Sequence, residues 1–128
     1  MKFENIRTAL LVEDEAVIAL DLEDTLAHAG LSRFMTVSSC AAAKDWLSTN
    51  TPDAAILDIS LRDGPSTEIA LTLLARRVPF IVYTGIDEGP SPIFDKVERL
   101  MKPKSSDAIL SALRASVRRA KADRCAVP

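Results

Sequence analysis

Short apolar runs alternate along this chain with longer segments in which apolar residues recur at helical spacing. The short runs have the composition of buried strands, and they fall at about residues 7–12, 34–37, 54–58, 78–84 and 97–101. The helical segments between them lie at about residues 15–29, 41–47, 66–77 and 105–120. Because strands alternate with helices, the pattern predicts five parallel strands joined by right-handed crossovers. We therefore expect a three-layer, doubly wound α/β fold with helices on both faces of the sheet.

The stretch from Gly85 to Pro92 does not fit this alternation. It holds two glycines and two prolines where a fourth crossover helix is expected to begin. We therefore expect the fourth crossover helix to be short, at about residues 93–96, or disordered.

Residues typical of helix ends mark the limits of the predicted helices. Gly30 is expected to end the first helix, Ser38 or Ser39 to cap the second, and Ser66 to cap the third. The 128 residues are enough for one hydrophobic core, and no repeat or linker is visible. We expect a single domain over residues 1–128, with a core at about 6–120 and a flexible tail at 121–128.

Polar residues stand at the ends of four predicted strands. They are Glu13 and Asp14 after the first, Asp58 at the end of the third, Thr84 at the end of the fourth and Lys102 after the fifth. Ligands of open parallel sheets bind at the carboxyl edge of the strands. If these strands are neighbours, three carboxylates, a hydroxyl and an ammonium meet in one cleft. That set suits a divalent cation together with a phosphoryl group.

Each of these residues also has an ordinary structural explanation. Acidic residues such as Glu13 and Asp14 favour a helix N-terminus, and we expect Glu15 to act only in that way. Asp58 is a common turn residue, and the threonine and the lysine are compatible with a plain strand position and a solvated surface. Their shared place at strand ends favours one common site.

Charge and chain ends exclude several classes of protein. The formal net charge of −2 argues against a general nucleic-acid binder. The first apolar run stops at Glu13, too soon for a secretory or membrane-spanning segment, so we expect a cytoplasmic protein without a membrane partner. Cys40 and Cys125 lack the spacing of a zinc site or a disulfide framework.

Four motifs in this order resemble the receiver domain of two-component response regulators over nearly the whole chain. The acidic motif of that family resembles Leu11-Val12-Glu13-Asp14-Glu15, and its phosphoacceptor segment resembles Ile56-Leu57-Asp58-Ile59. Thr84 stands where the family has its switch hydroxyl, and Lys102-Pro103 is similar to the Lys-Pro pair after the fifth strand. The resemblance implies a flavodoxin-like receiver fold and a cis bond before Pro103.

The resemblance also implies the role of each site residue. Asp58 would accept a phosphoryl group from a histidine kinase or histidine phosphotransfer protein, with Thr84 and Lys102 binding the phosphoryl oxygens. Glu13, Asp14, Asp58 and the backbone carbonyl of Ser60 would hold Mg²⁺. Since the three carboxylates repel one another without a metal, we predict that Mg²⁺ stabilises the fold.

Three departures from the family pattern bear on signalling. The proline of the loop after Asp58 comes late, at Pro65, and Arg99 stands where the family usually has an aromatic residue. The run from Pro79 to Gly85 partly resembles the Pro-Phe-x-Phe-Ala-Thr-Gly-Tyr signature of the atypical FAT GUY subgroup. Tyr83, next to Thr84, is an alternative candidate for the aromatic residue that reports phosphorylation. We expect residues 85–95 to form an output surface that phosphorylation orders through Thr84.

Three hypotheses follow for the function. The first is a stand-alone phosphoacceptor, not an enzyme with a separate substrate, that signals to an unknown protein target without an effector domain of its own. The second is a phosphate-independent pseudo-receiver adaptor, to which Arg99 and the altered loop point. The third is a small metal-dependent phosphohydrolase with Asp58 as nucleophile, for which the sequence offers no general acid.

Overall fold

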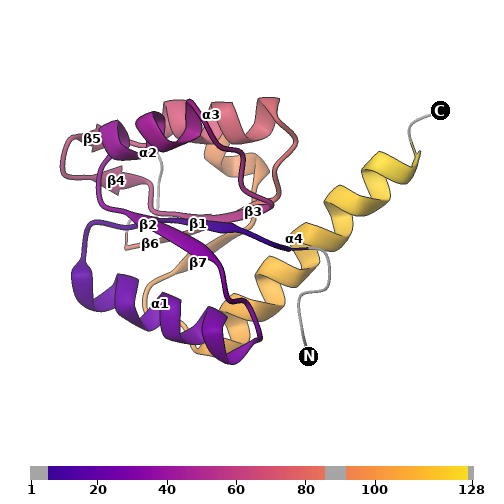
Figure 1. The fold of residues 1–128 in the computed structure, drawn as a ribbon, viewed down its shortest axis with the longest axis horizontal. Helices are drawn as coiled ribbons and strands as arrows, with labels where there is room; N and C mark the ends of the chain where they lie inside the picture. The colour runs from indigo at the N-terminus through magenta and orange to yellow at the C-terminus, as the bar shows by residue number, and fades with distance from the viewer. Residues whose placement is uncertain (1–5, 86–91, 127–128) are drawn as a thin grey trace.

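The computed structural model describes residues 6–85 and 92–126, apart from the side chains of residues 95, 96 and 123–126. Its five parallel strands are β1 (Ala9–Val12), β2 (Phe34–Val37), β3 (Ala54–Leu57), β6 (Phe80–Thr84) and β7 (Arg99–Met101). The α-helices are α1 (Ala16–His28), α2 (Cys40–Leu47), α3 (Thr67–Ala75) and α4 (Ser106–Ala126). Figure 1 shows α2 and α3 on one face of the sheet and α1 and α4 on the other. The predicted three-layer, doubly wound α/β fold is confirmed.

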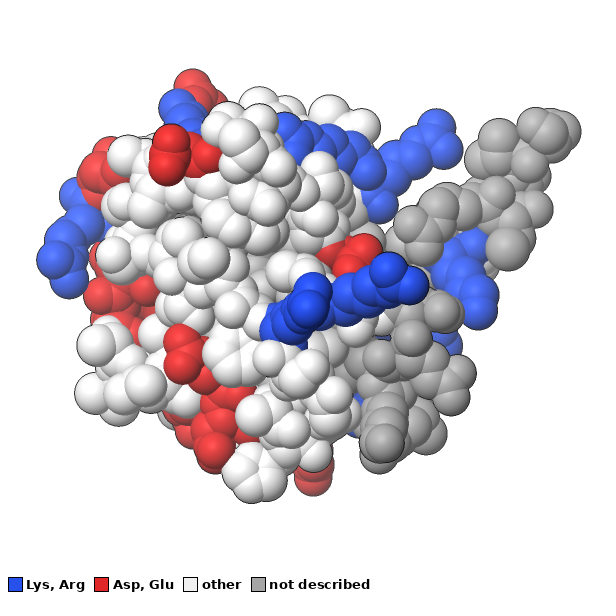
Figure 2. All heavy atoms as spheres, viewed as in Figure 1, with Lys and Arg blue, Asp and Glu red and all other residues white. Residues whose placement is uncertain are grey.

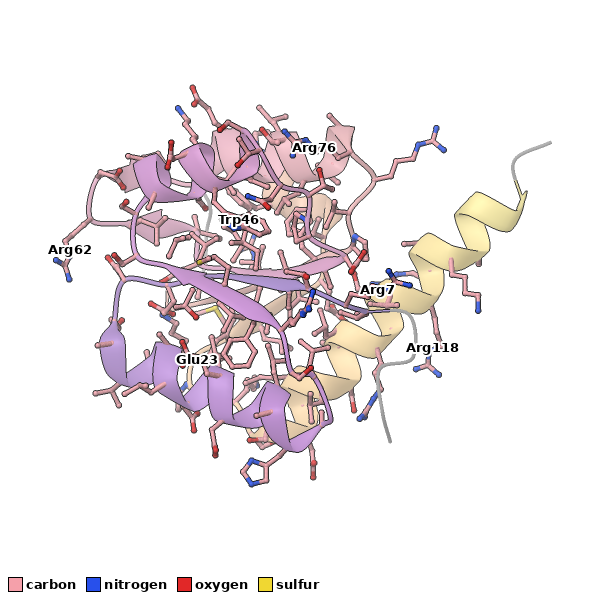
Figure 3. All side chains as sticks on the ribbon, viewed as in Figure 1. Arg7, Glu23, Trp46, Arg62, Arg76 and Arg118 are labelled. Atoms are coloured by element: carbon pink, nitrogen blue, oxygen red, sulfur yellow. The ribbon has the colours of Figure 1, made fainter. Side chains whose placement is uncertain are left out.

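Two hydrophobic cores lie on the two faces of the sheet, because successive strand residues point in opposite directions. In β1, Leu10 and Val12 pack towards α2 and α3, and Trp46 of α2 packs against the same core (Figure 3). Leu11, between them, packs towards α1 and α4. Strands β1, β3 and β6 are buried along their whole length, as expected for parallel strands covered on both faces.

The strand order β2-β1-β3-β6-β7 places the reversal of the chain's winding between β1 and β3. From β1 the chain crosses to β2 on one side, and from β3 it continues through β6 to β7 on the other. In open α/β sheets this switch point leaves a crevice at the carboxyl ends of the central strands. The crevice here lies between the ends of β1 and β3, next to Glu13 and Asp58.

The fourth crossover contains the short 3-10 helix η1 (Pro92–Lys96), which packs on α3. This confirms that any helix in the crossover is short, at about the predicted residues. Phe94 of η1 is fully buried in the α2–α3 core and fixes the position of this turn. Residues 86–91 of the proposed output segment lie outside the described residues.

Helix α4 extends to Ala126, so the prediction that the helix ends at about Ala120 is wrong for the described residues. The stretch 121–126 contains no glycine or proline, and its alanine, lysine and arginine residues are strong helix formers. Nothing in the local sequence therefore ends the helix at Ala120. Because the first turns of α4 are packed on the sheet, the helix is nucleated there and can continue through these residues.

The first two helix ends are confirmed. Gly30 follows α1 with a φ of 92°, in the range that glycine adopts without strain. Ser39 caps α2 by accepting a hydrogen bond from the Ala42 N–H. Ser66 precedes α3 but makes no side-chain cap, and its actual role belongs to the site described below.

The charged surface is mixed. On the face shown in Figure 2, lysine and arginine side chains are separated by uncharged and acidic residues. Among residues 6–85 and 92–126, no helix combines the length and the apolar composition needed to cross a membrane.

Candidate functional site

The ends of four neighbouring strands bring the predicted residues together. Val12 pairs with Leu57, Leu57 with Val82, and Thr84 with Met101, so the residues that follow these positions share one edge of the sheet. Backbone hydrogen bonds continue past the strands: Asp58 N–H donates to the Val12 carbonyl at 3.0 Å, and Lys102 N–H donates to the Thr84 carbonyl at 2.8 Å. The regular ladder therefore holds the backbone of the site.

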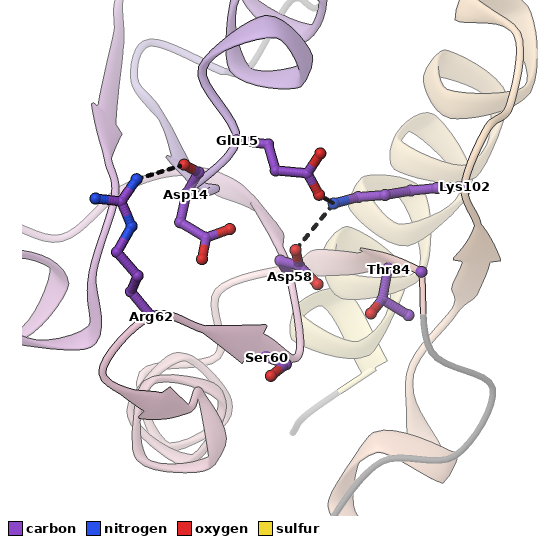
Figure 4. A pocket seen from close by; sticks show the side chains of 8 residues that line it. Asp14, Glu15, Asp58, Ser60, Arg62, Thr84 and Lys102 are labelled. Carbon is purple, nitrogen blue, oxygen red and sulfur yellow. Dashed lines mark hydrogen bonds and ion pairs between the residues drawn. The ribbon is translucent and has the colours of Figure 1, made fainter.

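A cleft of about 480 Å³ opens at this edge (Figure 4). Its walls come from the β1–α1 loop, the segment after β3, and the ends of β6 and β7. The lining residues are Asp14, Glu15, Asp58, Ser60, Arg62, Thr84, Gly85 and Lys102. Four of the five predicted site residues line the cleft: Asp14, Asp58, Thr84 and Lys102. The fifth, Glu13, is buried and contacts Lys102.

Glu13, Asp14 and Asp58 form the acidic centre of the site. Each offers a carboxylate oxygen, and the three oxygens lie within 4.8 Å of one another. Glu13 and Asp58 are only 3% and 6% exposed, whereas Asp14 is half-buried. Oxygen donors at this spacing fit a hard divalent cation such as Mg²⁺, which takes one or two carboxylates and keeps water for its other positions. The donor set fits Mg²⁺, and Ser60 lies at the cleft where its carbonyl could join.

Lys102 is the cation of the site. Its Nζ lies 2.7 Å from Glu13 Oε1, 2.9 Å from Asp58 Oδ2 and 3.6 Å from Glu15 Oε1. The side chain is 11% exposed, so its pairs with the buried Glu13 and Asp58 are poorly screened by solvent, whereas the exposed Glu15 is well screened. Lys102-Pro103 is a cis peptide bond, as the family resemblance implied.

Glu15 has a different contact from the one predicted. It occupies the N-cap position of α1 but makes no side-chain cap, and its carboxylate points to Lys102 (Figure 4). Instead, Glu13 Oε2 accepts the hydrogen bond of the Glu15 N–H at 3.1 Å. The prediction that Glu15 acts only at the helix N-terminus is therefore wrong, because its carboxylate also pairs with Lys102.

The electrostatics of the site reflect crowding of like charges. Burial raises the pKa of Glu13, and the nearby Asp58 carboxylate raises it further, against the opposing hydrogen bonds from Lys102 and the Glu15 N–H. Burial alone lowers the pKa of Lys102, but its hydrogen bonds and charge attraction to Glu13 and Asp58 outweigh burial and leave that pKa raised. Glu13 therefore depends on Lys102, and on any bound cation, for its charged form.

The raised pKa of Glu13 predicts a pH dependence of stability. Because folding raises this pKa above its ordinary value of 4.5, protonated Glu13 stabilises the fold below that pH, and the contribution is lost as pH rises through the raised pKa. As pH rises through this window, the free energy of unfolding of the original protein should fall more steeply than that of the Glu13→Gln protein. Urea titrations of both proteins across the window measure the difference. Identical pH profiles would contradict the assignment, and Mg²⁺ should reduce the difference.

Ser66 supports the acidic centre, a role that sequence reasoning did not find. Its fully buried hydroxyl lies 2.6 Å from the Asp58 carbonyl oxygen and 3.1 Å from the Ile59 carbonyl oxygen, and the hydroxyl donates to these acceptors. Ser66 N–H also donates to the Ile59 carbonyl at 2.8 Å. These bonds close the loop onto the backbone of Asp58. Serine before a helix usually signals a cap, so the local sequence pointed to the wrong role.

Ser66→Ala is expected to weaken Mg²⁺ binding as well as stability. Losing the hydroxyl removes one donor from two buried carbonyls, at a cost of about 1–2 kcal/mol, and loosens the backbone of Asp58. Ser39→Ala, which removes the α2 cap at a similar cost of about 1 kcal/mol, is the matched control. Calorimetric titration should show weaker Mg²⁺ binding only in Ser66→Ala. Equal affinity in both variants would exclude the supporting role.

The loop after Asp58 forms a small hairpin that the sequence did not predict. Its strands are β4 (Ser60–Leu61) and β5 (Gly64–Pro65). Asp63, at its tip, accepts hydrogen bonds from the Cys40 and Ala41 N–H groups, which hold the pKa of Asp63 below its usual range. Arg62, whose side chain projects from the hairpin (Figure 3), donates to the Asp14 carbonyl at 3.3 Å (Figure 4). The hairpin is thus tied to α2 and to the β1–α1 loop.

Arg99 and Tyr83, the two residues considered as replacements for the family's aromatic switch residue, lie in different places. Arg99 is half-buried in the edge strand β7, opposite Val82 of β6. Tyr83 is buried on the other face of β6, packed with α1 and α4 and away from the core that contains η1. A Tyr83 ring in this place does not face the η1 side of the sheet, where the output segment was expected.

Solved structures with this fold are numerous. SdrG from Sphingomonas melonis Fr1 is 37% identical, with a TM-score of 0.78 over 90% of this chain and 98% of that one. A response regulator receiver domain protein (CheY-like) from Methanospirillum hungatei JF-1 is 18% identical, with a TM-score of 0.81 over 93% of this chain and 99% of that one.

A two-component response regulator from Clostridium difficile is 21% identical, with a TM-score of 0.76 over 88% of this chain and 96% of that one. No protein-family model and no curated protein matches the chain.

Proposed function

This chain belongs to the response regulator receiver domains of two-component signalling, and we propose that it accepts a phosphoryl group on Asp58 with the help of Mg²⁺. The observation that carries the proposal is the cluster of Glu13, Asp14 and Asp58 at the switch point of the sheet, in which Glu13 and Asp58 also contact Lys102. We propose further that the donor is a histidine kinase or a histidine phosphotransfer protein, and that the reaction takes place in the cytoplasm.

Asp58 is the carboxylate best suited to act as the nucleophile. It faces the cleft, whereas Glu13 is buried beneath the cleft and caps the Glu15 N–H. In the proposed step an Asp58 oxygen bonds to phosphorus while the bond from phosphorus to the donor nitrogen breaks. Such transfer depends on positioning and on neutralising the phosphoryl oxygens rather than on covalent help from the protein.

Lys102 and Thr84 are the proposed partners of the phosphoryl oxygens. The Lys102 ammonium already lies 2.9 Å from Asp58, so it needs little movement to pair with a group attached there. Thr84 lines the cleft from the end of β6 and offers a hydroxyl donor. A Mg²⁺ ion held by Glu13, Asp14 and Asp58 would supply positive charge to the same oxygens.

The charge balance of the site supports a divalent metal. Three ionised carboxylates and one ammonium leave a net charge of −2, which one Mg²⁺ ion neutralises. The site is therefore strained by repulsion when empty and relaxed when filled. Thermal melts with and without millimolar Mg²⁺ test this, since an unchanged melting temperature would count against the metal site.

The test of the function is the intact mass of the protein after incubation with acetyl phosphate and Mg²⁺. We expect the mass of one phosphoryl group to be added in the presence of Mg²⁺ and not in the presence of a chelator. Peptide mapping should place the phosphoryl group on Asp58. Failure of labelling by acetyl phosphate and by a panel of histidine kinases would favour the phosphate-independent adaptor instead.

A further inference from the structure

Tyr83 connects the active-site lysine to the body of the domain. It is the only tyrosine in the chain and the neighbour of Thr84 in β6. Its side chain is 5% exposed and packs among residues of α1 and α4, including Leu26 and Ile109. A phenol at this depth needs a partner for its oxygen, and the identity of that partner gives the residue its role.

The partner of the Tyr83 hydroxyl is the turn that follows Lys102. The Lys104 N–H donates to Tyr83 Oη at 3.0 Å. At the other end of the turn, the Lys102 N–H donates to the carbonyl of Thr84 at 2.8 Å. Pro103, between them, has no N–H to add. Two successive residues of β6 therefore hold both ends of the segment from Lys102 to Lys104.

The ring of Tyr83 contacts the same lysine from a second direction. Lys102 Nζ lies 5.9 Å from the centre of the ring, within the range at which a cation is attracted to an aromatic face. Glu13 and Asp58 hold the same ammonium at 2.7 and 2.9 Å. The ring therefore adds a weak attraction that favours this position of the ammonium.

We infer that Tyr83 is a positioning residue for Lys102: its hydroxyl fixes the backbone of the Lys102–Lys104 turn, and its ring borders the ammonium. The consequence for phosphoryl transfer rests on the proposed function, but the effect on Lys102 itself does not. An anchored turn keeps the ammonium at the place where a phosphoryl group on Asp58 needs a counter-charge. Without the hydroxyl, the Lys104 N–H loses this acceptor and the turn gains freedom.

The test compares Tyr83→Phe with Ile81→Val. The first variant removes only the hydroxyl, while the second trims a fully buried residue of the same strand and the same core without touching the turn. NMR of selectively labelled lysine, recorded without any phosphodonor, reports the order of the Lys102 side chain. Lys102→Met identifies its signal.

In Tyr83→Phe we expect the NMR signal of Lys102 to report a less ordered side chain. Phosphorylation by acetyl phosphate should slow about three- to tenfold, the effect of one hydrogen bond. Ile81→Val should leave both unchanged. Tyr83→Leu, which removes the ring as well, should slow phosphorylation further. If Tyr83→Leu fails to fold, Tyr83→Phe still decides the question.

Two results would overturn the inference. One is a Tyr83→Phe protein whose Lys102 signal and phosphorylation rate both match those of the original. The other is an Ile81→Val protein whose Lys102 signal and phosphorylation rate change as much as those of Tyr83→Phe. The effect would then come from general loosening of the core. If the original protein takes up no phosphoryl group at all, the proposed function fails, and the lysine signal still shows whether Tyr83 positions Lys102.

Discussion

Asp58→Asn should take up no phosphoryl group under conditions that label the original protein fully. Asparagine keeps the shape of the side chain, and its amide oxygen can still accept from Lys102, so the fold is expected to stay intact. What it loses is the anionic oxygen that attacks phosphorus in the proposed reaction. Glu13 cannot replace it, because that carboxylate does not line the cleft and its second oxygen already accepts the Glu15 N–H.

Stability separates a lost nucleophile from a damaged fold. Removing the Asp58 charge relieves its repulsion with Glu13 and gives up part of the attraction to Lys102, so we expect the unfolding free energy to change by about 1 kcal/mol or less. Intact mass and a thermal melt are measured on the same sample. A folded Asp58→Asn protein that is labelled like the original would exclude Asp58 as the acceptor.

Asp53→Asn is the matched control for this experiment. Asp53 is also a carboxylate just outside a strand, but it accepts hydrogen bonds from the Arg7 and Thr8 N–H groups at the opposite edge of the sheet. The substitution keeps the net charge equal to that of Asp58→Asn. We expect Asp53→Asn to be labelled at the rate of the original protein.

Lys102→Met should lower both stability and phosphorylation. Methionine fills a similar space but leaves Glu13 and Asp58, both buried, without their shared cation. Breaking a buried ion pair by removing one partner typically costs about 3 kcal/mol or more. Removing a positive group aimed at the phosphoryl oxygens should also slow labelling of Asp58, on the order of 100-fold.

Mg²⁺ distinguishes this result from ordinary core damage. Because the ion supplies the missing positive charge next to the same carboxylates, it should restore part of the stability lost in Lys102→Met, and more than it adds to the original protein. Lys104→Met removes an exposed lysine from the same turn and keeps the backbone N–H that binds Tyr83, so it serves as the control. Urea titrations with Mg²⁺ or a chelator measure all three proteins.

A Lys102→Met protein as stable as the original in the presence of chelator would show that the ammonium does not support the carboxylates. Labelling of Lys102→Met at the rate of Lys104→Met would show that it does not support the reaction. Either outcome would remove Lys102 from the site as described.

The sequence was sufficient for the parts of the site that lie on strand ends. A buried parallel strand reads as a short apolar run, and the residue that follows it must lie at the carboxyl edge of the sheet. Asp58 and Lys102 could therefore be expected in one cleft before any contact was known. The strand order β2-β1-β3-β6-β7 then made that expectation hold.

The contacts that the sequence did not predict are those made between different segments of the structure, whether near or far apart in the chain. Ser66 and Glu15 looked like helix caps because nearby sequence shows only local partners, yet their side chains contact the Asp58 carbonyl and Lys102. Asp63 caps a helix that begins 23 positions earlier in the chain. In each case the partner lies outside the helix turn next to which the residue stands in the sequence.

The amino-acid sequence by itself determined the layers, the parallel sheet and the edge at which the acidic residues, Thr84 and Lys102 gather, because hydrophobic period and strand-end position are local properties of the chain. Only the tertiary structure decided which carboxylates share Lys102, how the hairpin after Asp58 is tied down and which side of β6 Tyr83 occupies relative to the active-site lysine. These depend on distances between side chains of different elements, which packing sets and local periodicity does not encode.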